Sequence, residues 1–335
     1  MEFAIEILEE QQELLVENLR WSEGEEREQD NKRLKEVNDA LLILNSSSLL
    51  LNNSLKEGNT VKYKGEKYTL TFVDLKKGNI ELMQGDCIEA MSMLPDNSID
   101  AIITDPPYGT TACKWDSVID FDLMWEQLNR IIKPNGAIVL FGSEPFSSAL
   151  RMSNIKNYKY DWTWKKSKPN GFQHSKNKPM KAIENIMVFS NAPMGHKSLL
   201  KEKRMEYNPQ GLKEVGIKKV KDCSHRGNTM GGDGKKSSRL NQVGREYMAY
   251  TNFPSDFLEY GNIIGKNAIH PTQKPIPLME YLIKTYTKEN ETVLDFTMGS
   301  GTTGVAAKNT NRNFIGIEQD EKYFNIAKNR IMSQI

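Results

Sequence analysis

The chain has 335 residues, of which 38% are hydrophobic and 27% charged, and its formal net charge is +1 at pH 7. This composition is typical of a globular protein and excludes the fibrous and disulfide-scaffold classes. No apolar run approaches the roughly 18 residues of a membrane helix, and the first residues are acidic where a signal peptide would be basic. The three cysteines are widely spaced, which fits reduced thiols, so we expect a cytoplasmic protein that does not contact a membrane.

Charge is distributed unevenly along the chain. Residues 1–57 hold 14 acidic and 6 basic residues, a net charge of −8, whereas residues 156–262 hold 21 basic and 10 acidic residues, a net charge of +11. A strongly basic stretch in a neutral protein fits a polyanionic partner. A lysine-rich solvated surface fits the charge equally well.

Residues 1–57 are expected to form an α-helical extension. Apolar side chains recur at heptad spacing from Met1 to Leu19 and again from Leu34 to Leu55. Two such seams predict an αα-hairpin or a short coiled coil. Because short isolated helices are marginal in water, the seams need an apolar partner: each other, the rest of the chain, or a second copy of it.

The pattern then changes to strands and helices. Residues 58–77 alternate apolar and polar side chains around Lys64-Gly65-Glu66, which is typical of a small β-hairpin, here serving as a linker. From residue 78 strands alternate with helices, which predicts an α/β fold with a mostly parallel sheet covered on both faces. The seven predicted strands are residues 80–83, 99–104, 137–141, 160–164, 186–189, 292–296 and 314–318. Helices are predicted at residues 87–94, 121–132, 276–285, from about 303 and from 320.

An insertion interrupts this alternation. Residues 78–189 and 263–335 carry the predicted strands and helices, whereas residues 190–262 are rich in Gly, Lys and Asn. We expect residues 190–262 to form an inserted, loop-rich subdomain.

A glycine-rich turn follows the predicted strand at residues 292–296. Gly299, Gly301 and Gly304 match the pattern G-x-G-x-x-G, in which the backbone passes close to a ligand. Glu318 comes 19 residues after Gly299, at the end of the next strand, where an acid can accept hydrogen bonds from the ribose hydroxyls of an adenosine. On its own, this pattern also fits a nicotinamide-dependent oxidoreductase.

The position of the turn argues for a different order of strands. Only 31 residues follow Gly304, and they contain a single predicted strand. The rest of the sheet must therefore come from upstream sequence, so the domain is predicted to be circularly permuted.

A second candidate site is the segment Asp105-Pro106-Pro107-Tyr108, directly after the predicted strand at residues 99–104. The prolines fix a rigid extended turn, and the carboxyl end of a strand is where α/β sheets bind ligands. The Asp105 carboxylate and the Pro106 carbonyl can accept hydrogen bonds from an amino group, and Tyr108 can stack on a planar ring. The segment is suited to a planar substrate with an exocyclic amine.

Together these residues resemble the S-adenosylmethionine-dependent DNA amino-methyltransferases, and among them the permuted β group. The resemblance covers roughly residues 78–335 and rests on motifs that occur in one order: Gly85-Asp86-Cys87, Asp105 to Tyr108, His270 to Pro275, and Asp295 to Gly304 with Glu318. It implies a circularly permuted, Rossmann-like methyltransferase fold with a seven-stranded sheet. Residues 78–189 would be its catalytic half, residues 190–262 its target-recognition region and residues 263–335 its cofactor-binding half.

The resemblance also implies the role of each residue. The cofactor S-adenosylmethionine would be bound by Asp86, Thr272, Gln273, Lys274, Asp295, Phe296, Gly299, Gly301, Thr302, Thr303 and Glu318. Of these, Asp86 would contact the adenine amine of the cofactor, Glu318 its ribose hydroxyls, and residues 272–274 would close over its methionine end. Asp105, Pro106, Pro107 and Tyr108 would hold the target base. No metal is expected.

The implied partner is double-stranded DNA, from which a base must flip out before its amine can react. Adenine N6 is the preferred target, because Asp at the first position of the catalytic motif goes mostly with adenine in this family; N4-cytosine is the close alternative. A carbon-5 cytosine enzyme is disfavoured, because it needs a covalent cysteine and Cys113 has no activating pattern beside it. A nicotinamide-dependent oxidoreductase and an inert DNA-binding module are more distant alternatives.

The resemblance suggests two further partners. One is a separate restriction endonuclease. The other is a second copy of the chain: since β-group enzymes are often dimers, we favour a homodimer through the N-terminal helices over pairing within one chain.

Overall fold

The computed structural model describes residues 29, 32–33, 59–63, 66–75, 78–109, 117–195, 203–219, 246–262, 269 and 273–333. Apart from residues 29, 32 and 33, the predicted helical extension at residues 1–57 lies outside the described residues. The same holds for Thr272 and for Cys113.

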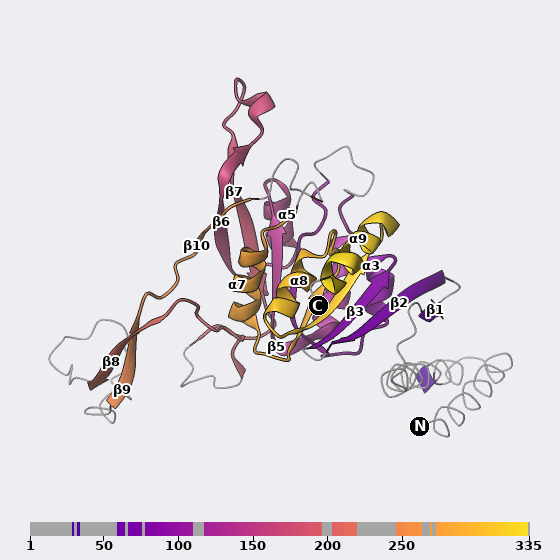
Figure 1. Ribbon diagram of the computed structural model, residues 1–335, viewed down its shortest axis with the longest axis horizontal. Coiled ribbons are helices and arrows are strands. Elements are labelled where there is room, and N and C mark those ends of the chain that lie inside the picture. The colour runs from indigo at the N-terminus through magenta and orange to yellow at the C-terminus, as the bar shows by residue number, and fades with distance from the viewer. Residues whose placement is uncertain are drawn as a thin grey trace.

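The core is one ten-stranded sheet with the order β1-β2-β3-β12-β11-β4-β5-β7-β6-β10 (Figure 1). Five neighbouring strands in its middle are parallel, from β3 to β5, and β7 runs antiparallel between β5 and β6. The seven strands predicted from sequence are β3 (Gly78–Gln84), β4 (Ile99–Thr104), β5 (Ile132–Gly142), β6 (Tyr158–Asn170), β7 (Lys181–Phe189), β11 (Thr292–Asp295) and β12 (Asn313–Glu318). The strand with the glycine-rich turn, β11, lies between β12 and β4 although it comes near the end of the chain.

The predicted count of seven strands is wrong, because three further strands extend the edges of the sheet. The hairpin of β1 (Asn59–Tyr63) and β2 (Glu66–Leu75) forms as predicted, but β2 also pairs antiparallel with β3, so the hairpin is part of the sheet rather than a linker. At the other edge, β10 (Phe257–Tyr260) pairs in parallel with β6. Leu258 of β10 is buried, so this end of the predicted insertion belongs to the core.

Helices cover both faces of the sheet. Those on one face are α3 (Cys87–Ser92), α4 (Phe121–Ile131) and α5 (Phe146–Ser153), and those on the other are α7 (Ile276–Tyr286), α8 (Thr302–Asn309) and α9 (Glu321–Met332). Side chains of β5 alternate between the two layers: Val139 and Phe141 face α7 to α9, whereas Ile138 and Leu140 face α3 to α5. Among the described helices, none combines the length and hydropathy needed to cross a membrane.

The helix α4 shows how sequence sets these elements. The Asp120 side chain caps its first turn by accepting hydrogen bonds from the backbone N–H groups of Asp122 and Leu123 at 3.0 and 3.1 Å. Met124, Leu128 and Ile131 then recur at helical spacing and are buried in one core cluster. The helix ends at Ile131, and extended backbone begins at once with β5, five residues before the start of the strand predicted at residues 137–141.

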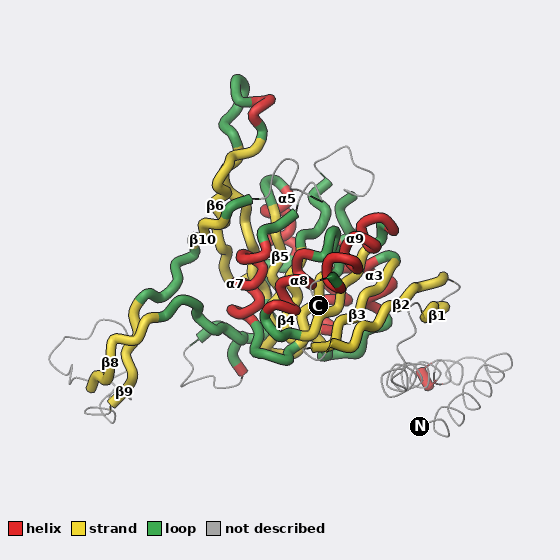
Figure 2. Tube along the Cα trace, in the orientation of Figure 1, coloured by secondary structure: helices red, strands yellow, loops and turns green. Residues whose placement is uncertain are grey.

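Two hairpins project from this body. Beyond the sheet, β6 and β7 continue as an arm, residues 167–181, in which every residue is exposed and whose tip carries the short 3-10 helix Phe172–His174 (Figure 2). A separate two-stranded sheet of β8 (Lys213–Lys219) and β9 (Glu246–Thr251) lies away from the body on the opposite side of Figure 1 from β1. The insertion is therefore more regular than the loop-rich segment that we expected.

Candidate active site

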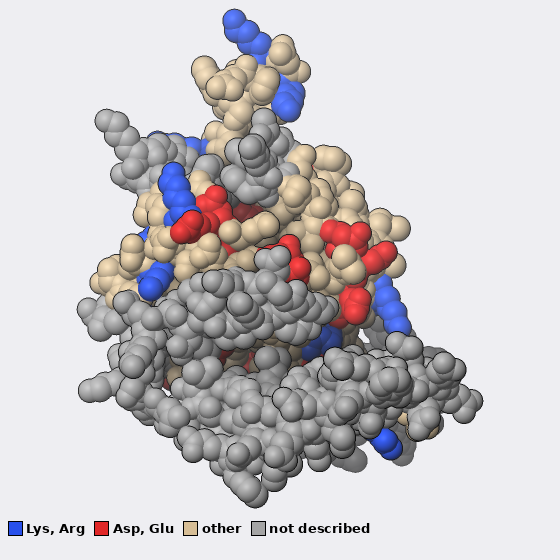
Figure 3. Space-filling view, turned by 90° about the vertical axis from the view of Figure 1, so that its right-hand side faces the viewer, with Lys and Arg blue, Asp and Glu red and all other residues tan. Residues whose placement is uncertain are grey.

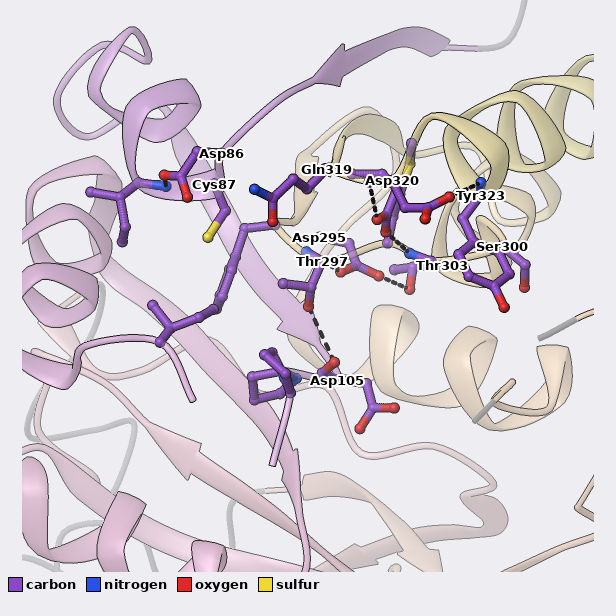
Figure 4. A pocket seen from close by; sticks show the side chains of 18 of the residues that line it. Asp86, Cys87, Asp105, Asp295, Thr297, Ser300, Thr303, Gln319, Asp320 and Tyr323 are labelled. Atoms are coloured by element: carbon purple, nitrogen blue, oxygen red, sulfur yellow. Dashed lines mark hydrogen bonds between the residues drawn. The ribbon is translucent and has the colours of Figure 1, made fainter. Parts of the chain in front are cut away.

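The carboxyl ends of β3, β4, β11 and β12 surround one cavity of about 830 Å³ (Figure 4). Parallel strands end at a common edge, so residues far apart in the sequence meet there. Of the residues predicted to form the site, the cavity is lined by Asp86, Asp105, Pro106, Pro107, Tyr108, Gln273, Lys274, Asp295, Phe296, Gly299, Thr302, Thr303 and Glu318. The structure thus brings both predicted halves, target and cofactor, into a single cavity.

Gly301 differs from the other predicted residues, because it does not line the cavity. Its backbone is left-handed, with φ of 77°, and it begins α8. A Cβ atom at this position would lie 2.8 Å from the Cβ of Ala327 in α9. A glycine is therefore required for the turn and for the close packing of α8 against α9.

Glu318 connects the glycine-rich turn to the end of β12. One carboxylate oxygen accepts a hydrogen bond from Gly299 N–H at 2.8 Å, and the other accepts one from Asp320 N–H at 2.9 Å. Burial raises the pKa of Glu318. The two backbone donors fix the orientation of the carboxylate, whose remaining lone pairs face a cavity large enough for a nucleoside.

A buried cluster joins the glycine-rich turn to the strand that precedes the target segment. The Asp295 carboxylate accepts hydrogen bonds from the hydroxyls of Thr104 and Thr303 and, at 3.2 Å, from Thr297 N–H. The Thr297 hydroxyl lies 2.9 Å from that of Thr104 and donates to the Asp105 carbonyl at 3.1 Å (Figure 4). Burial raises the pKa of Asp295 to about 6. Sequence reasoning did not assign Thr104 or Thr297, although both flank predicted site residues.

The Asp105 side chain has two partners within the site. The Tyr108 hydroxyl donates to one carboxylate oxygen, and the Lys274 ammonium donates to the other. Burial raises the pKa of Asp105, and Lys274 acts in the opposite direction. The Tyr108 ring packs against Phe146 of α5 with centroids 5.1 Å apart, so the ring is fixed at the wall of the cavity.

Lys274 is also part of a buried ion cluster that sequence reasoning missed. Its ammonium lies 3.7 Å from a carboxylate oxygen of Glu184 in β7, and the other oxygen of Glu184 pairs with Lys166 in β6. The signal available in the sequence was an acid two residues before the predicted strand at residues 186–189, among lysines. The resemblance placed Lys274 at the methionine end of the cofactor, whereas in this structure its ammonium contacts Asp105.

The remaining side chains of interest at the rim have structural roles. Asp86 caps α3, accepting hydrogen bonds from the N–H groups of Ile88 and Glu89 at 2.9 and 3.2 Å. Burial, reinforced by Asp86, raises the pKa of the neighbouring Cys87 thiol to about 12, so Cys87 is a poor nucleophile. Away from the rim, Trp162 and Trp164 of β6 are buried in the core.

The lining is strongly acidic. It contains one basic side chain, Lys274, and seven acids: Asp86, Glu89, Asp105, Asp120, Asp295, Glu318 and Asp320. This count covers the described residues that line the cavity. Such a lining favours a ligand with positive charge and opposes the pyrophosphate of a nicotinamide dinucleotide.

Comparison with known proteins points in the same direction. A family model described as a DNA methylase, N6_N4_Mtase, matches residues 99–329. The chain is 29% identical over 306 residues to the type II methyltransferase M2.LlaDCHI of Lactococcus lactis subsp. cremoris, a match that covers 82% of this chain and 96% of the relative. It is 26% identical over 278 residues to the type II methyltransferase M.HinfI of Haemophilus influenzae, with 75% of this chain and 67% of the relative covered.

A solved structure shares the fold. The PvuII DNA methyltransferase, described as cytosine-N4-specific, aligns with a TM-score of 0.51 over 76% of this chain and 86% of its own. The sequence identity is 16%, so the likeness concerns the fold alone.

The buried Asp295 carboxyl generates a prediction about stability. Its pKa of about 6 lies above the ordinary value of 3.8, so the native state holds this proton more tightly than the unfolded state. Relative to an Asp295→Asn variant, the parent should lose about 2 kcal/mol of unfolding free energy as the pH rises from 4 to 6. Urea unfolding at several pH values measures both proteins, and parallel curves would contradict the assignment.

Proposed function

The chain belongs to the DNA methylase family whose model spans residues 99–329, and from this premise we propose that it methylates adenine N6 in DNA, using S-adenosylmethionine. The observation that carries the proposal is the single cavity in which Asp105 and Pro106 lie together with the glycine-rich turn and Glu318. The order of these segments along the chain supports a circularly permuted domain.

The residues of the cofactor half fit S-adenosylmethionine. The oriented Glu318 carboxylate can accept hydrogen bonds from both ribose hydroxyls, and Asp86 lies at the rim where the adenine amine of the cofactor would be held. The acidic lining suits the sulfonium and ammonium charges of the cofactor. Bound there, S-adenosylmethionine would supply a methyl group on a sulfonium, which needs no further activation.

The contribution of the protein is then to hold the target amine. The lone pair of an aromatic amine is delocalised into the ring, which makes the nitrogen a poor nucleophile. Hydrogen bonds from its two N–H groups to the Asp105 carboxylate and the Pro106 carbonyl would favour a localised lone pair. Tyr108, fixed against Phe146, would hold the plane of the flipped base. Orientation and electrostatics of this kind are the main sources of rate acceleration in such a transfer.

We prefer adenine over cytosine because the segment begins with Asp105; this rests on the family pattern. N4-cytosine is the alternative. We further propose that the enzyme works in the cytoplasm as the modification half of a type II system with a separate endonuclease, as the names of its relatives suggest. A homodimer through residues 1–57 remains part of the proposal.

The basic arm supports contact between the protein and DNA near the site. Residues 167–181 contain four lysines and no acid, and the tip of the arm shows lysine side chains at the top of Figure 3. The strand β6 runs in the same direction as β4. The arm extends from the carboxyl end of β6, so it leaves the sheet on the same side as Asp105, which follows the carboxyl end of β4. We assign phosphate contact to this arm and target recognition to the hairpin of β8 and β9.

The activity itself is testable with the full chain. Purified protein, S-adenosylmethionine labelled in the methyl group and unmodified genomic DNA should yield N6-methyladenine after digestion to nucleosides. An Asp105→Ala variant should transfer methyl groups about 10²–10³-fold more slowly, since it lacks one electrostatic contact to the reacting group. Its affinity for the cofactor, measured by calorimetry, should stay within about twofold of the parent.

Each possible result tests a different part of the proposal. N4-methylcytosine as the product would move the target to cytosine, and 5-methylcytosine would refute the amine chemistry. No incorporation by the parent would refute the proposed function. Turnover by Asp105→Ala near the parental rate would leave the activity standing and remove Asp105 from its role.

Neutralising the arm should weaken DNA binding without changing the preferred site. Replacing Lys168, Lys176 and Lys178 by Gln should flatten the plot of log affinity against log salt by roughly 0.9 for each phosphate that the arm no longer binds. Fluorescence anisotropy at several salt concentrations measures the slope. The matched control replaces three lysines away from the arm, Lys156, Lys284 and Lys308; an equal decrease in slope there would show that the arm has no special role.

Removing the hairpin of β8 and β9 should abolish the preference of the enzyme for one DNA site. Asn252 Nδ2 donates to the Gly211 carbonyl at 2.6 Å, so residues 212–251 can be replaced by a short glycine linker without disturbing β10. The variant should still bind the cofactor, but methylate DNA without the site preference of the parent. Modification-sensitive sequencing of the product decides this, and an unchanged site would assign recognition elsewhere.

A further inference from the structure

Four largely buried charged side chains form a row that ends in the target-binding segment. They alternate in sign in the order Lys166, Glu184, Lys274, Asp105, and they come from β6, β7, the residue before Pro275 at the start of α7, and the end of β4. Their side chains are 6, 12, 8 and 19% exposed, respectively. The row has no net charge, which reduces the cost of keeping it away from water.

Lys274 is held where the target amine is expected. Its ammonium donates to one oxygen of Asp105, while the Tyr108 hydroxyl donates to the other. An amine that enters the cavity must therefore compete with an ammonium group for the Asp105 carboxylate. As long as Lys274 stays in place, it also neutralises the charge that would polarise the amine.

Glu184 offers Lys274 a second position. Glu184 Oε2 lies 3.7 Å from the Lys274 ammonium, is buried, and has no hydrogen-bond partner among the residues that the structure describes. A buried acceptor without a partner is costly, so a small movement of the ammonium towards Glu184 would satisfy it. Lys274 Nζ lies 4.9 Å from the centroid of the Phe141 ring, which favours the cation throughout this movement.

We propose that Lys274 and Glu184 are positioning residues for the target base: Lys274 holds Asp105 in the free enzyme and moves to Glu184 Oε2 when the target amine takes its place on Asp105. The inference rests on the proposed function, because it concerns the amine that Asp105 holds. Lys166 tunes the exchange, since it competes with Lys274 for the same Glu184 carboxylate.

The proposal predicts opposite effects for the two partners of one ion pair. Glu184→Gln removes the charge that receives Lys274, so the ammonium stays on Asp105 and the single-turnover rate of methyl transfer should fall at least tenfold. Lys166→Met removes the cation that competes for Glu184, so Glu184 can pair with Lys274 only, and the rate of methyl transfer should equal or exceed that of the parent. The affinity for S-adenosylmethionine should stay within twofold in both variants, because neither residue lines the cavity.

Further variants separate positioning from a structural role. Glu184→Asp keeps the charge and should retain more of the rate than Glu184→Gln. In a Lys274→Met background, Glu184→Gln should change the rate less than twofold, because the exchange it serves is gone. The matched control is Glu259→Gln, which breaks an exposed ion pair with Lys165 on the neighbouring pair of strands and should leave the rate unchanged.

The experiment uses the full chain, saturating S-adenosylmethionine and unmodified genomic DNA, with the melting temperature of each variant recorded. A parental rate for Glu184→Gln would overturn the proposal. Rates that fall in both Glu184→Gln and Lys166→Met, in step with their melting temperatures, would also overturn it and leave a structural cluster. A parent that methylates no DNA would instead refute the proposed function, so the two failures are distinguishable.

Discussion

The contacts around Asp295 hold the two halves of the site in register. Asp295 ends β11 and binds Thr104 at the end of β4, while Thr297 from the glycine-rich turn donates to the carbonyl of Asp105. These residues are about 190 positions apart in the sequence. Because Asp295, Thr104 and Thr303 are buried, removing one of the hydrogen bonds between them would leave an unsatisfied polar group. In the proposed function, the distance between cofactor and target amine would therefore depend on this cluster.

A division of charge follows from the same geometry. The cavity at the end of the strands is acidic, whereas the arm that leaves the sheet at that edge is basic. An acidic cavity attracts a cationic ligand and a basic arm attracts a polyanion, so in the proposed function the cofactor and the DNA would each be guided to their own surface. The acidic lining also disfavours phosphate groups in the cavity. In the proposed function, a flipped base would therefore enter the cavity while its phosphate backbone stayed outside.

Much of the fold follows from local sequence, and the exceptions have identifiable causes. The periodicity of apolar residues predicted seven strands, and the structure contains all seven. The short strand β10 was not predicted, because it has only four residues and depends on pairing with β6, which no local pattern reveals. The helix α5 was missed, because its eight residues include three serines and are too few to show a clear helical repeat of apolar side chains. Turn chemistry and strand ends pointed to Asp105 and the glycine-rich turn, which follow strands, and to Glu318, which ends one. Glu184 and Lys166 were beyond sequence reasoning, because their role depends on where β6 and β7 lie relative to Asp105.

The row of four charged side chains from Lys166 to Asp105 raises the question of why charged rather than apolar residues occupy these positions. Apolar side chains of similar volume often give a more stable interior than buried ion pairs, so a row of four charges is a poor choice for stability alone. What an apolar replacement cannot provide is a cation that leaves a carboxylate when a neutral amine arrives. In the proposal, Asp105 is paired with Lys274 in the free enzyme and yet becomes available to the target amine. An alternating row meets both needs, because moving one ammonium between two carboxylates keeps every charge close to an opposite charge at each stage.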